Sequence, residues 1–361
     1  MKAAVMVKAG ELKVMDVPDL KPNAYQALVK ISHCAICNGT DWSLLNGTFP
    51  PPSFPIPGLF SYGYRGYFPG LIGHESVGEV IEIGSKVTRY KKGDIVLRVS
   101  AYYPDEKPYK SYWGGFNEYG YVEDVFLYEK EKPELAGPCM YMQQVVPKEM
   151  DRAAATMLIT LKEARSSLQG FGLKPRESLF IWGGGPVGQC FARWAKVMGA
   201  YPVILCDRHP ERLEFAKKMG ADFTVNPKEG DVAKQVMKIT GGKGAQKVVN
   251  AIGDYKSVEA SFPFLAGGGQ IGIYGIPRTS IPPKPEETTI ELGKRVFTWG
   301  PWNLMTINPD EAGAHQQVLD AVRLGLFNPK DLVTQVIPLA EIREGFELLK
   351  NRKAMKVVVQ M

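Results

Sequence analysis

Short apolar runs, separated by glycine and proline, characterise the first 150 residues of the chain. Clear examples are Gln26–Ile31, Gly78–Ile83 and Asp94–Val99, in which aliphatic and β-branched residues dominate. Strands that follow one another this closely are typical of β-barrels and sandwiches. The last run, Met355–Gln360, also predicts a strand, and we expect it to return to this first domain because a chain end usually needs a partner to be ordered.

From about residue 151 to residue 302 the pattern changes to an alternation of strands and helices. Apolar runs typical of strands recur here: Ser178–Trp182, Tyr201–Cys206, Lys247–Ile252, Gln270–Gly275 and Arg295–Trp299. Helical patterns follow the first two runs, at Pro186–Met198 before Gly199 and at Pro210–Met219 before Gly220. This alternation predicts an α/β domain with a doubly wound parallel sheet and helices on both of its faces.

The length of 361 residues is too great for one ordinary hydrophobic core and fits two domains. We expect residues 1–150 and 303–361 to form the β-rich domain, with a helix at Glu311–Leu324. Residues 151–302 would form the parallel α/β domain, inserted between the two parts of the first.

Composition and charge exclude several classes of protein. The formal net charge is +6, and 44 Lys and Arg residues are interleaved with 38 Asp and Glu residues, whereas a nucleic-acid binder concentrates its positive charge. No window of about 18 apolar residues predicts a membrane span. The run Met1–Val7 lacks the apolar core and cleavage site of a signal peptide, so we expect a cytoplasmic protein. The five cysteines are odd in number and scattered, which argues against a disulfide framework.

A glycine-rich turn follows one of the predicted strands and leads into a helix. Its residues include Gly183, Gly185, Pro186, Val187 and Gly188, with the glycines in Gly-x-Gly-x-x-Gly spacing. In this motif the first glycine permits a tight turn, the second lets the backbone approach a pyrophosphate, and the third lets the helix pack on the strand. The free N–H groups at the start of the helix favour phosphate binding, so the turn predicts a dinucleotide site.

An acidic residue, Asp207, follows the next predicted strand, 19 residues after Gly188. A carboxylate at this place can accept hydrogen bonds from the adenosine ribose and would repel a 2′-phosphate, which favours NAD over NADP. The neighbouring Arg208 could instead bind a 2′-phosphate, so NADP is the alternative cofactor. A structural glycine turn with a capping aspartate is the alternative to a cofactor site.

Two short segments carry possible metal ligands. The first contains Cys34 and Cys37 in Cys-x-x-Cys spacing, and the second contains the pair His74–Glu75 between glycines. Neither segment is decisive alone. No second Cys-x-x-Cys follows, so a structural zinc bound by four cysteines is not expected.

Taken together, these motifs resemble those of the zinc-containing alcohol dehydrogenase family of medium-chain dehydrogenases. The resemblance rests on Gly73-His74-Glu75-x-x-Gly78, Gly84, Val87 and Gly93-Asp94-x-Val96, preceded by Cys37-x-x-Thr40-Asp41 and followed by the turn at Gly183–Gly188. The resemblance covers nearly the whole chain. Within the family, the chain is most similar to the polyol and sugar dehydrogenases. This resemblance implies a Rossmann domain for the cofactor and a GroES-like barrel as the catalytic domain.

The resemblance implies a role for each matching residue. Cys37 would be a thiolate ligand and His74 the imidazole ligand of one catalytic zinc ion. Asp41 would orient His74, Thr40 would carry the substrate's hydroxyl proton toward solvent, and Glu75 would bind zinc directly or through water. Zinc lowers the pKa of a bound hydroxyl, which prepares its carbon to transfer a hydride to nicotinamide. The structural alternatives are a buried thiol for Cys37, a turn histidine for His74 and a turn cap for Thr40.

The chain departs from the family in its loops. One residue more than in many relatives separates Cys37 from Thr40, which could shift the thiolate or the hydroxyl. The stretch Ala101–Tyr119 lacks the four cysteines of a structural zinc lobe, and its aromatic residues could pack in place of the metal. The loop Phe49–Gly70, rich in proline, glycine and aromatic residues, is longer than usual and could cover the substrate site or form a subunit contact.

A further departure concerns the third protein ligand of the zinc. In the family this ligand falls near Thr156–Leu161, where the chain offers no good zinc ligand. Three possibilities follow: Glu75 completes the site, Glu163 completes it, or zinc binds weakly through Cys37, His74 and water.

The sequence therefore predicts a zinc-dependent oxidoreductase that transfers a hydride between NAD(H) and a secondary alcohol or ketone. The expected substrate is a polyol, cyclitol or sugar derivative, and the expected assembly is a homodimer or homotetramer. Two other functions are possible. A zinc-free quinone or enone reductase of the same superfamily would explain the missing third ligand. A non-catalytic NAD-binding sensor would need the glycine turn but not Cys37.

Overall fold

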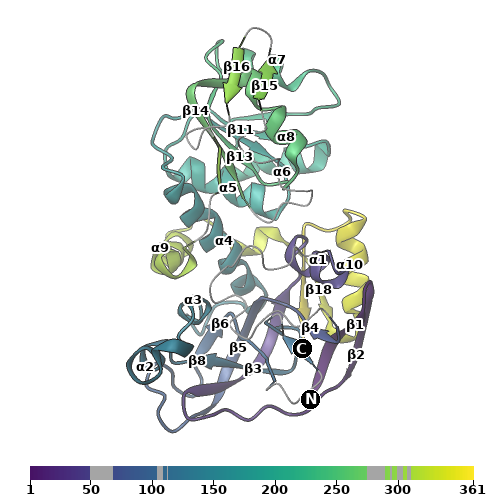
Figure 1. The fold of residues 1–361 in the computed structure, drawn as a ribbon, viewed down its shortest axis with the longest axis vertical. Helices are drawn as coiled ribbons and strands as arrows, with labels where there is room; N and C mark the ends of the chain where they lie inside the picture. The colour runs from purple at the N-terminus through teal and green to yellow at the C-terminus, as the bar shows by residue number, and fades with distance from the viewer. Residues whose placement is uncertain are drawn as a thin grey trace. The chain divides into compact units, whose positions relative to one another are not determined.

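The computed structural model describes residues 1–48, 68–103, 109–111, 113–274, 289–292, 295–298, 304–306 and 310–361. The chain divides into two compact units, and many of their elements are labelled in Figure 1. Unit 1 consists of Met1–Ile159 and Asn328–Met361, and unit 2 consists of Thr160–Phe327. Most of the predicted loop Phe49–Gly70 lies outside the described residues, as does Tyr112.

Unit 1 contains two sheets. A four-stranded sheet has the order β2-β1-β4-β7, with β1 at Lys2–Lys8, β2 at Glu11–Asp16, β4 at Gly70–Leu71 and β7 at Lys110–Ser111. A seven-stranded sheet has the order β18-β19-β3-β5-β6-β9, with β8 paired to β3. Its strands are β3 (Gln26–Ala35), β5 (Glu75–Ile83), β6 (Ile95–Leu97), β8 (Tyr119–Glu123), β9 (Val145–Val146), β18 (Val333–Pro338) and β19 (Lys356–Gln360). Alternate residues of β3, such as Val29 and Ile31, are buried in its core, as the period of a strand requires.

Several short helices complete unit 1. They are α1 (Thr40–Leu45), α2 (Val125–Glu131), α3 (Pro138–Tyr141) and α10 (Ile342–Lys350), with the 3-10 helices η1 (Pro133–Leu135), η4 (Pro329–Leu332) and η5 (Leu339–Glu341). The buried residues of α10 recur at helical spacing, at Ile342, Phe346 and Leu349. A Cβ on Gly345 of the same face would lie 2.7 Å from the side-chain end of Ile337 and 2.8 Å from that of Ile36, so a larger residue would force these side chains to shift.

The carboxyl end of β3 is where three segments of unit 1 meet. Ala35 of β3 pairs with Glu75, the first residue of β5, and with Val358 of β19. The pairing of β19 with β3 confirms that the C-terminal strand returns to the first part of the chain. It also brings Lys356 close to Glu75, although 281 residue positions separate them in the sequence.

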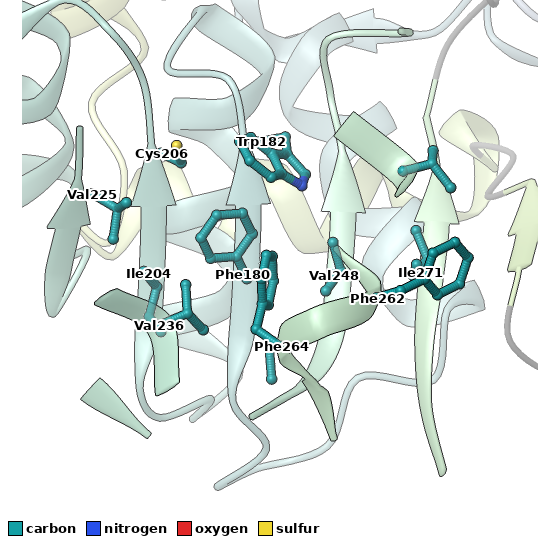
Figure 2. Close-up of a cluster of buried hydrophobic side chains, with 12 residues drawn as sticks. Phe180, Trp182, Ile204, Cys206, Val225, Val236, Val248, Phe262, Phe264 and Ile271 are labelled. Carbon is teal, nitrogen blue, oxygen red and sulfur yellow. The ribbon is translucent and has the colours of Figure 1, made fainter. Parts of the chain in front are cut away.

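Unit 2 is built on a six-stranded parallel sheet of order β12-β11-β10-β13-β14-β17. Its strands are β10 (Leu179–Trp182), β11 (Val203–Cys206), β12 (Phe223–Val225), β13 (Ala245–Asn250), β14 (Leu265–Ile273) and β17 (Leu304–Thr306). Figure 2 shows the apolar core on one face of this sheet, where Phe180 and Trp182 of β10 pack against Phe264. The predicted class, a parallel α/β sheet, is confirmed.

Helices alternate with these strands. They are α4 (Arg152–Gly170, which begins in unit 1), α5 (Pro186–Val197), α6 (Pro210–Met219), α7 (Val232–Ile239), α8 (Tyr255–Glu259), α9 (Glu311–Arg323) and the 3-10 helix η2 (Phe262–Phe264). The longest of these, α4, has 19 residues and includes the charged residues Lys162, Glu163 and Arg165. In the described part of the chain, no helix has both the length and the apolar character needed to cross a bilayer.

Two features of unit 2 differ from those predicted from the sequence. The run predicted at Arg295–Trp299 forms β16 (Arg295–Thr298), which pairs antiparallel with β15 (Thr289–Leu292) in a separate sheet. Only two residues separate β15 from β16, and so short a connection permits antiparallel but not parallel pairing. The second difference is the return to unit 1, which lies at residue 328 and not at residue 303. Helix α9 belongs to unit 2 because Phe327, just beyond it, packs against Trp194.

Candidate metal centre and cofactor turn

Three residues with metal-ligating side chains gather in unit 1. The ligand atoms of Cys37, His74 and Glu75 all lie within 4.8 Å of one another. His74 and Glu75 are buried, at 5% and 2% exposure, and Cys37 is half-buried. Thiolate, imidazole and carboxylate are the three ligand types by which proteins bind zinc. We call these three residues the ligand cluster, and the structure brings them together as the sequence motifs suggested.

Strand pairing and one glycine place the ligand cluster. Cys37 comes two residues after the end of β3 and Glu75 begins β5, so the pairing of Ala35 with Glu75 brings the two segments side by side. Gly73 has a left-handed φ of +100°, and a Cβ at this position would lie 2.7 Å from the ring of Phe116. A glycine is therefore required immediately before His74.

Asp41 links the two ligand segments. It lies in the first turn of α1, is fully buried, and has its Oδ1 at 3.2 Å from His74 Nδ1. Its Oδ2 accepts the backbone N–H of Cys37 at 2.9 Å. A proton on Nδ1, shared with Asp41, leaves Nε2 as the atom that can bind a metal. Burial lowers the pKa of His74, but the charge of Asp41 raises it well above its usual value.

A buried ion pair lies behind Glu75. Lys356 of β19 pairs with Glu75 Oε2, and the two side chains are 5% and 3% exposed. Burial lowers the pKa of Lys356, but the charges of Glu75 and Cys37 raise it above its usual value. The other carboxylate oxygen of Glu75, Oε1, lies 4.0 Å from His74 Nε2. Glu75 thus turns one oxygen to the lysine and the other to the ligand cluster.

The other residues of the segment Cys34–Asp41 differ in their surroundings. Cys34 is fully buried, and burial raises the pKa of its thiol well above the usual value, so it is a core residue. Thr40 is half-buried and is the first residue of α1, whose N-cap is Gly39. Thr40 is therefore not the cap of this helix. The additional residue before Thr40 leaves Cys37 within the ligand cluster.

Sequence reasoning missed three residues that surround the ligand cluster. They are Lys356, Arg98, which is buried and donates from Nη1 to the backbone oxygen of His74 at 2.9 Å, and Trp113, whose ring centroid lies 5.0 Å from that of His74. Arg98 and Lys356 fell within runs that predicted strands, and Trp113 within an aromatic stretch. A single basic residue inside an apolar strand run was the signal that could have found the first two, because a buried charge needs a partner.

The glycine turn of unit 2 leads from β10 into α5. Gly183 has a φ of +99°, and a Cβ on Gly188 would lie 1.8 Å from the carbonyl oxygen of Gly183. At Gly185, the N-cap of α5, a Cβ would meet no atom within 4 Å, so space is open there. Pro186 and Val187 form the first turn of α5, whose N–H groups are available to an anion.

Asp207 follows β11 and lies beside this turn. Its Oδ2 accepts the backbone N–H of Gly184 at 2.7 Å, and its Oδ1 accepts the N–H of His209 at 2.9 Å. Arg212 Nη1 lies 3.7 Å from Oδ2, whereas Arg208 is exposed. The carboxylate is therefore held against the turn that the sequence predicted to bind pyrophosphate.

Glu163, the alternative third ligand, lies on α4 in unit 2. Its Oε2 accepts a hydrogen bond from the hydroxyl of Tyr274, just beyond β14, at 2.8 Å. Tyr274 in turn packs edge-on against Phe191 of α5. A role for Glu163 as a metal ligand stays a prediction.

Both units match families of known proteins. Residues 23–132 match the alcohol dehydrogenase GroES-like domain, and residues 186–299 match the zinc-binding dehydrogenase family. An L-threonine 3-dehydrogenase of Pyrococcus abyssi is 31% identical over 97% of this chain and 95% of its own length. A D-arabitol-phosphate dehydrogenase of Enterococcus avium is 26% identical over 93% of this chain and 90% of its own length.

A solved structure gives the same result for the fold. Benzyl alcohol dehydrogenase of Acinetobacter calcoaceticus superposes with a TM-score of 0.78 at 20% identity, and the match covers 100% of this chain and 99% of that one. Together with the family matches, this likeness confirms the expected fold class, a GroES-like domain and a Rossmann-like domain.

Proposed function

Because the chain belongs to the zinc-containing alcohol dehydrogenase family of medium-chain dehydrogenases, we propose that it is a zinc-dependent enzyme that transfers a hydride between NAD(H) and a secondary alcohol or its ketone. The family supports an oxidoreductase that acts on alcohols. The observation that carries the finer proposal is the buried cluster of Cys37, His74 and Glu75. In this proposal unit 1 is the catalytic domain and unit 2 binds the dinucleotide.

The donor set of the ligand cluster fits a catalytic zinc ion. Three protein ligands leave the fourth tetrahedral position for substrate, which distinguishes catalytic from structural zinc sites. We assign the third ligand to Glu75 because its Oε1 lies 4.0 Å from His74 Nε2. Glu163 is the weaker choice because its carboxylate accepts a hydrogen bond from Tyr274. When bound, zinc lowers the pKa of a substrate hydroxyl and polarises a carbonyl.

The chain's own residues hold this site and move the proton. Asp41 keeps His74 oriented so that Nε2 points to the other ligands. Lys356 offsets the charge of Glu75, and both side chains are buried. Thr40 precedes Asp41, and a threonine hydroxyl can both accept and donate a proton. We assign to Thr40 Oγ1 the transfer of the substrate's hydroxyl proton toward solvent.

The glycine turn is proposed as the site of the NAD pyrophosphate. The open space at Gly185 and the free N–H groups of α5 support this assignment. Asp207 lies beside the turn, where its carboxylate would accept hydrogen bonds from the ribose and repel a 2′-phosphate. NAD is therefore the proposed cofactor. Arg208 is the residue through which NADP would bind instead.

The proposed substrate is a small polyol, cyclitol or sugar derivative that is oxidised at a secondary carbinol carbon. The name of one relative, a D-arabitol-phosphate dehydrogenase, supports a polyol. A homodimer or homotetramer is proposed by analogy with the family.

Metal analysis combined with a panel of polyols tests the proposal. The purified protein should carry about one zinc ion per chain and should reduce NAD faster than NADP with at least one polyol. Removal of zinc by a chelator should abolish the rise in absorbance that reports formation of reduced nicotinamide, and added zinc should restore this rise. Turnover of a quinone or enone that survives chelation would indicate a zinc-free reductase. Binding of NAD without turnover of any alcohol would indicate a sensor.

A further inference from the structure

Contacts fix His74 on three sides and leave its Nε2 edge to the ligand cluster. Asp41 lies at Nδ1, as described above. The guanidinium of Arg98 donates to the backbone oxygen of His74 at 2.9 Å. The ring of Trp113 packs against the imidazole in a tilted arrangement, with centroids 5.0 Å apart and planes inclined by 41°. The backbone, the ring and the ring nitrogen of His74 are thus each contacted by a different residue.

Arg98 and Trp113 also contact each other. The guanidinium carbon of Arg98 lies 5.9 Å from the ring centroid of Trp113, within the range of a cation–π interaction. Arg98 is buried at 4% exposure, although a guanidinium is never without charge in a protein. A buried charge of this kind persists only where it has specific partners.

Both residues adopt a backbone conformation that non-glycine residues avoid. Arg98 has a φ of +57° and Trp113 a φ of +73°. Such strain is retained only where surrounding contacts impose it, and it clusters at functional sites. At Arg98 the contacts are the bond from its N–H to the oxygen of Ser76 at 2.9 Å and the bond from Gln143 Nε2 to its oxygen at 3.2 Å.

We propose that Arg98 and Trp113 are positioning residues that hold His74 in its metal-binding orientation and thereby set the metal affinity of the ligand cluster. The inference rests on the proposed zinc site. His74 follows Gly73, and a glycine restrains the backbone less than any other residue does because it has no Cβ. The bond from Arg98 to the His74 oxygen restrains the backbone there, and the indole restricts rotation of the ring. A ligand that is already ordered loses less entropy when the metal binds.

The experiment measures zinc affinity in the full-length protein by competition with a chelator. Arg98→Met removes the donor, and Trp113→Leu removes the aromatic face. Each should weaken zinc binding by about 10- to 100-fold, the usual cost of losing a residue that orients a ligand. The double variant should lose less than the product of the two factors, because the residues contact each other. The absorption spectrum of the Co²⁺-substituted variants should change, since it reports the geometry of the ligands.

Arg89→Met is the matched control in the same unit. Arg89 donates to the backbone oxygen of Met140 at 3.0 Å and lies over the rings of Tyr90 and Phe126. Its loss should lower the melting temperature as the loss of Arg98 does, but leave zinc affinity and the Co²⁺ spectrum unchanged. Arg98→Lys, which keeps a charged donor, should recover part of the affinity and also serves if Arg98→Met does not fold.

The outcomes separate this inference from the function on which it rests. A wild-type protein that binds no zinc overturns the proposed function and this inference with it. A wild-type protein that binds zinc, together with Arg98 and Trp113 variants that bind it equally well, overturns this inference alone. An equal loss of affinity in Arg89→Met would also overturn it, because the effect would then be general destabilisation.

Discussion

The ligand cluster of unit 1 and the glycine turn of unit 2 are built in opposite ways. The turn consists of consecutive residues, Gly183–Gly188, and its form lies in the backbone, where a left-handed φ and missing Cβ atoms decide the fit. The cluster takes its side chains from two distant segments and is supported by Lys356 from the last strand. Neighbouring residues can specify a backbone motif, whereas a side-chain cluster requires several strands to be in register.

The two sites also differ in the burial and the partners of their charged side chains. Around the cluster, Asp41, Glu75 and Lys356 are all buried, so removal of one leaves another without its partner. At the turn, Asp207 is bound by backbone N–H groups and lies near Arg212. We therefore expect substitutions at the cluster to have larger effects than substitutions at the turn.

The largest effect is expected from loss of a ligand. Cys37→Ser and His74→Ala should each lose zinc and lower kcat/KM at least about 10³-fold, roughly 4 kcal/mol of transition-state stabilisation. Metal content and turnover of the best polyol measure this effect. Cys139→Ser, at a half-buried cysteine of the same unit that forms no disulfide, should keep both. Full turnover in both ligand variants would show that the chemistry lies elsewhere.

The next largest effect is expected on stability, from Lys356→Met. This change leaves Glu75 buried without its cation, which should lower the free energy of unfolding of the metal-free protein by about 3–5 kcal/mol. Lys330→Met is the control, because Lys330 pairs with Asp151 at 3.1 Å on the surface. Its cost should stay below about 1 kcal/mol. Urea unfolding compares the two, and equal costs would contradict the buried pair as a support of the cluster.

The glycine turn should show a smaller, purely steric cost. Gly188→Ala places a Cβ 1.8 Å from the oxygen of Gly183 and should lower the free energy of unfolding by about 1–3 kcal/mol. Gly185→Ala meets no atom and should change stability by less than about 1 kcal/mol, yet weaken NAD binding because the methyl group blocks the approach of the pyrophosphate. Thermal unfolding and NAD titration separate the two effects. Normal NAD affinity in Gly185→Ala would mean that the pyrophosphate lies elsewhere.

Cofactor choice should depend on a single carboxylate. Asp207→Asn keeps an acceptor for the N–H of Gly184 but removes the charge, so the preference for NAD over NADP should fall about tenfold, or 1.4 kcal/mol. Asp222→Asn is the control, since Asp222 also accepts a backbone N–H, that of Val203, but at another edge of the sheet. The ratio of kcat/KM values for the two cofactors measures the change. An unchanged ratio in Asp207→Asn would contradict the assignment of the ribose site.

The smallest effect concerns a buried carboxyl group of unit 1 outside the ligand cluster. Burial raises the pKa of Glu123, although Tyr102 and Gln26 donate hydrogen bonds to it and lower the pKa in part. The unfolded chain therefore ionises at lower pH than the folded one. Stability should decline as pH rises from 4.5 through the folded-state pKa. Glu123→Gln should remove this decline, and urea unfolding across that range would measure it. Parallel pH profiles for the two proteins would refute the expectation.

Local patterns were sufficient for elements whose signals lie within a few residues. The strands β10 and β11 and the helices α5 and α6 follow from apolar runs, helical spacing and terminal glycines. The same patterns could not predict that β16 pairs with β15 outside the parallel sheet. An apolar run indicates that a strand forms, but not which strand it pairs with. Nor could these patterns show that the chain returns to unit 1 at residue 328, because that boundary reflects contacts within unit 2, such as that of Phe327 with Trp194.

The sequence alone was sufficient to predict the fold class and the glycine turn. It also identified Cys37, His74 and Glu75 as candidate metal ligands. Three-dimensional packing placed these three together and added Lys356 and the residues that surround His74. The reason is that strand periodicity predicts which side of a strand is buried, but not which distant side chain a given residue of the strand contacts. That choice is made by the register of β3 with β5 and β19, which depends on contacts between segments far apart in the chain.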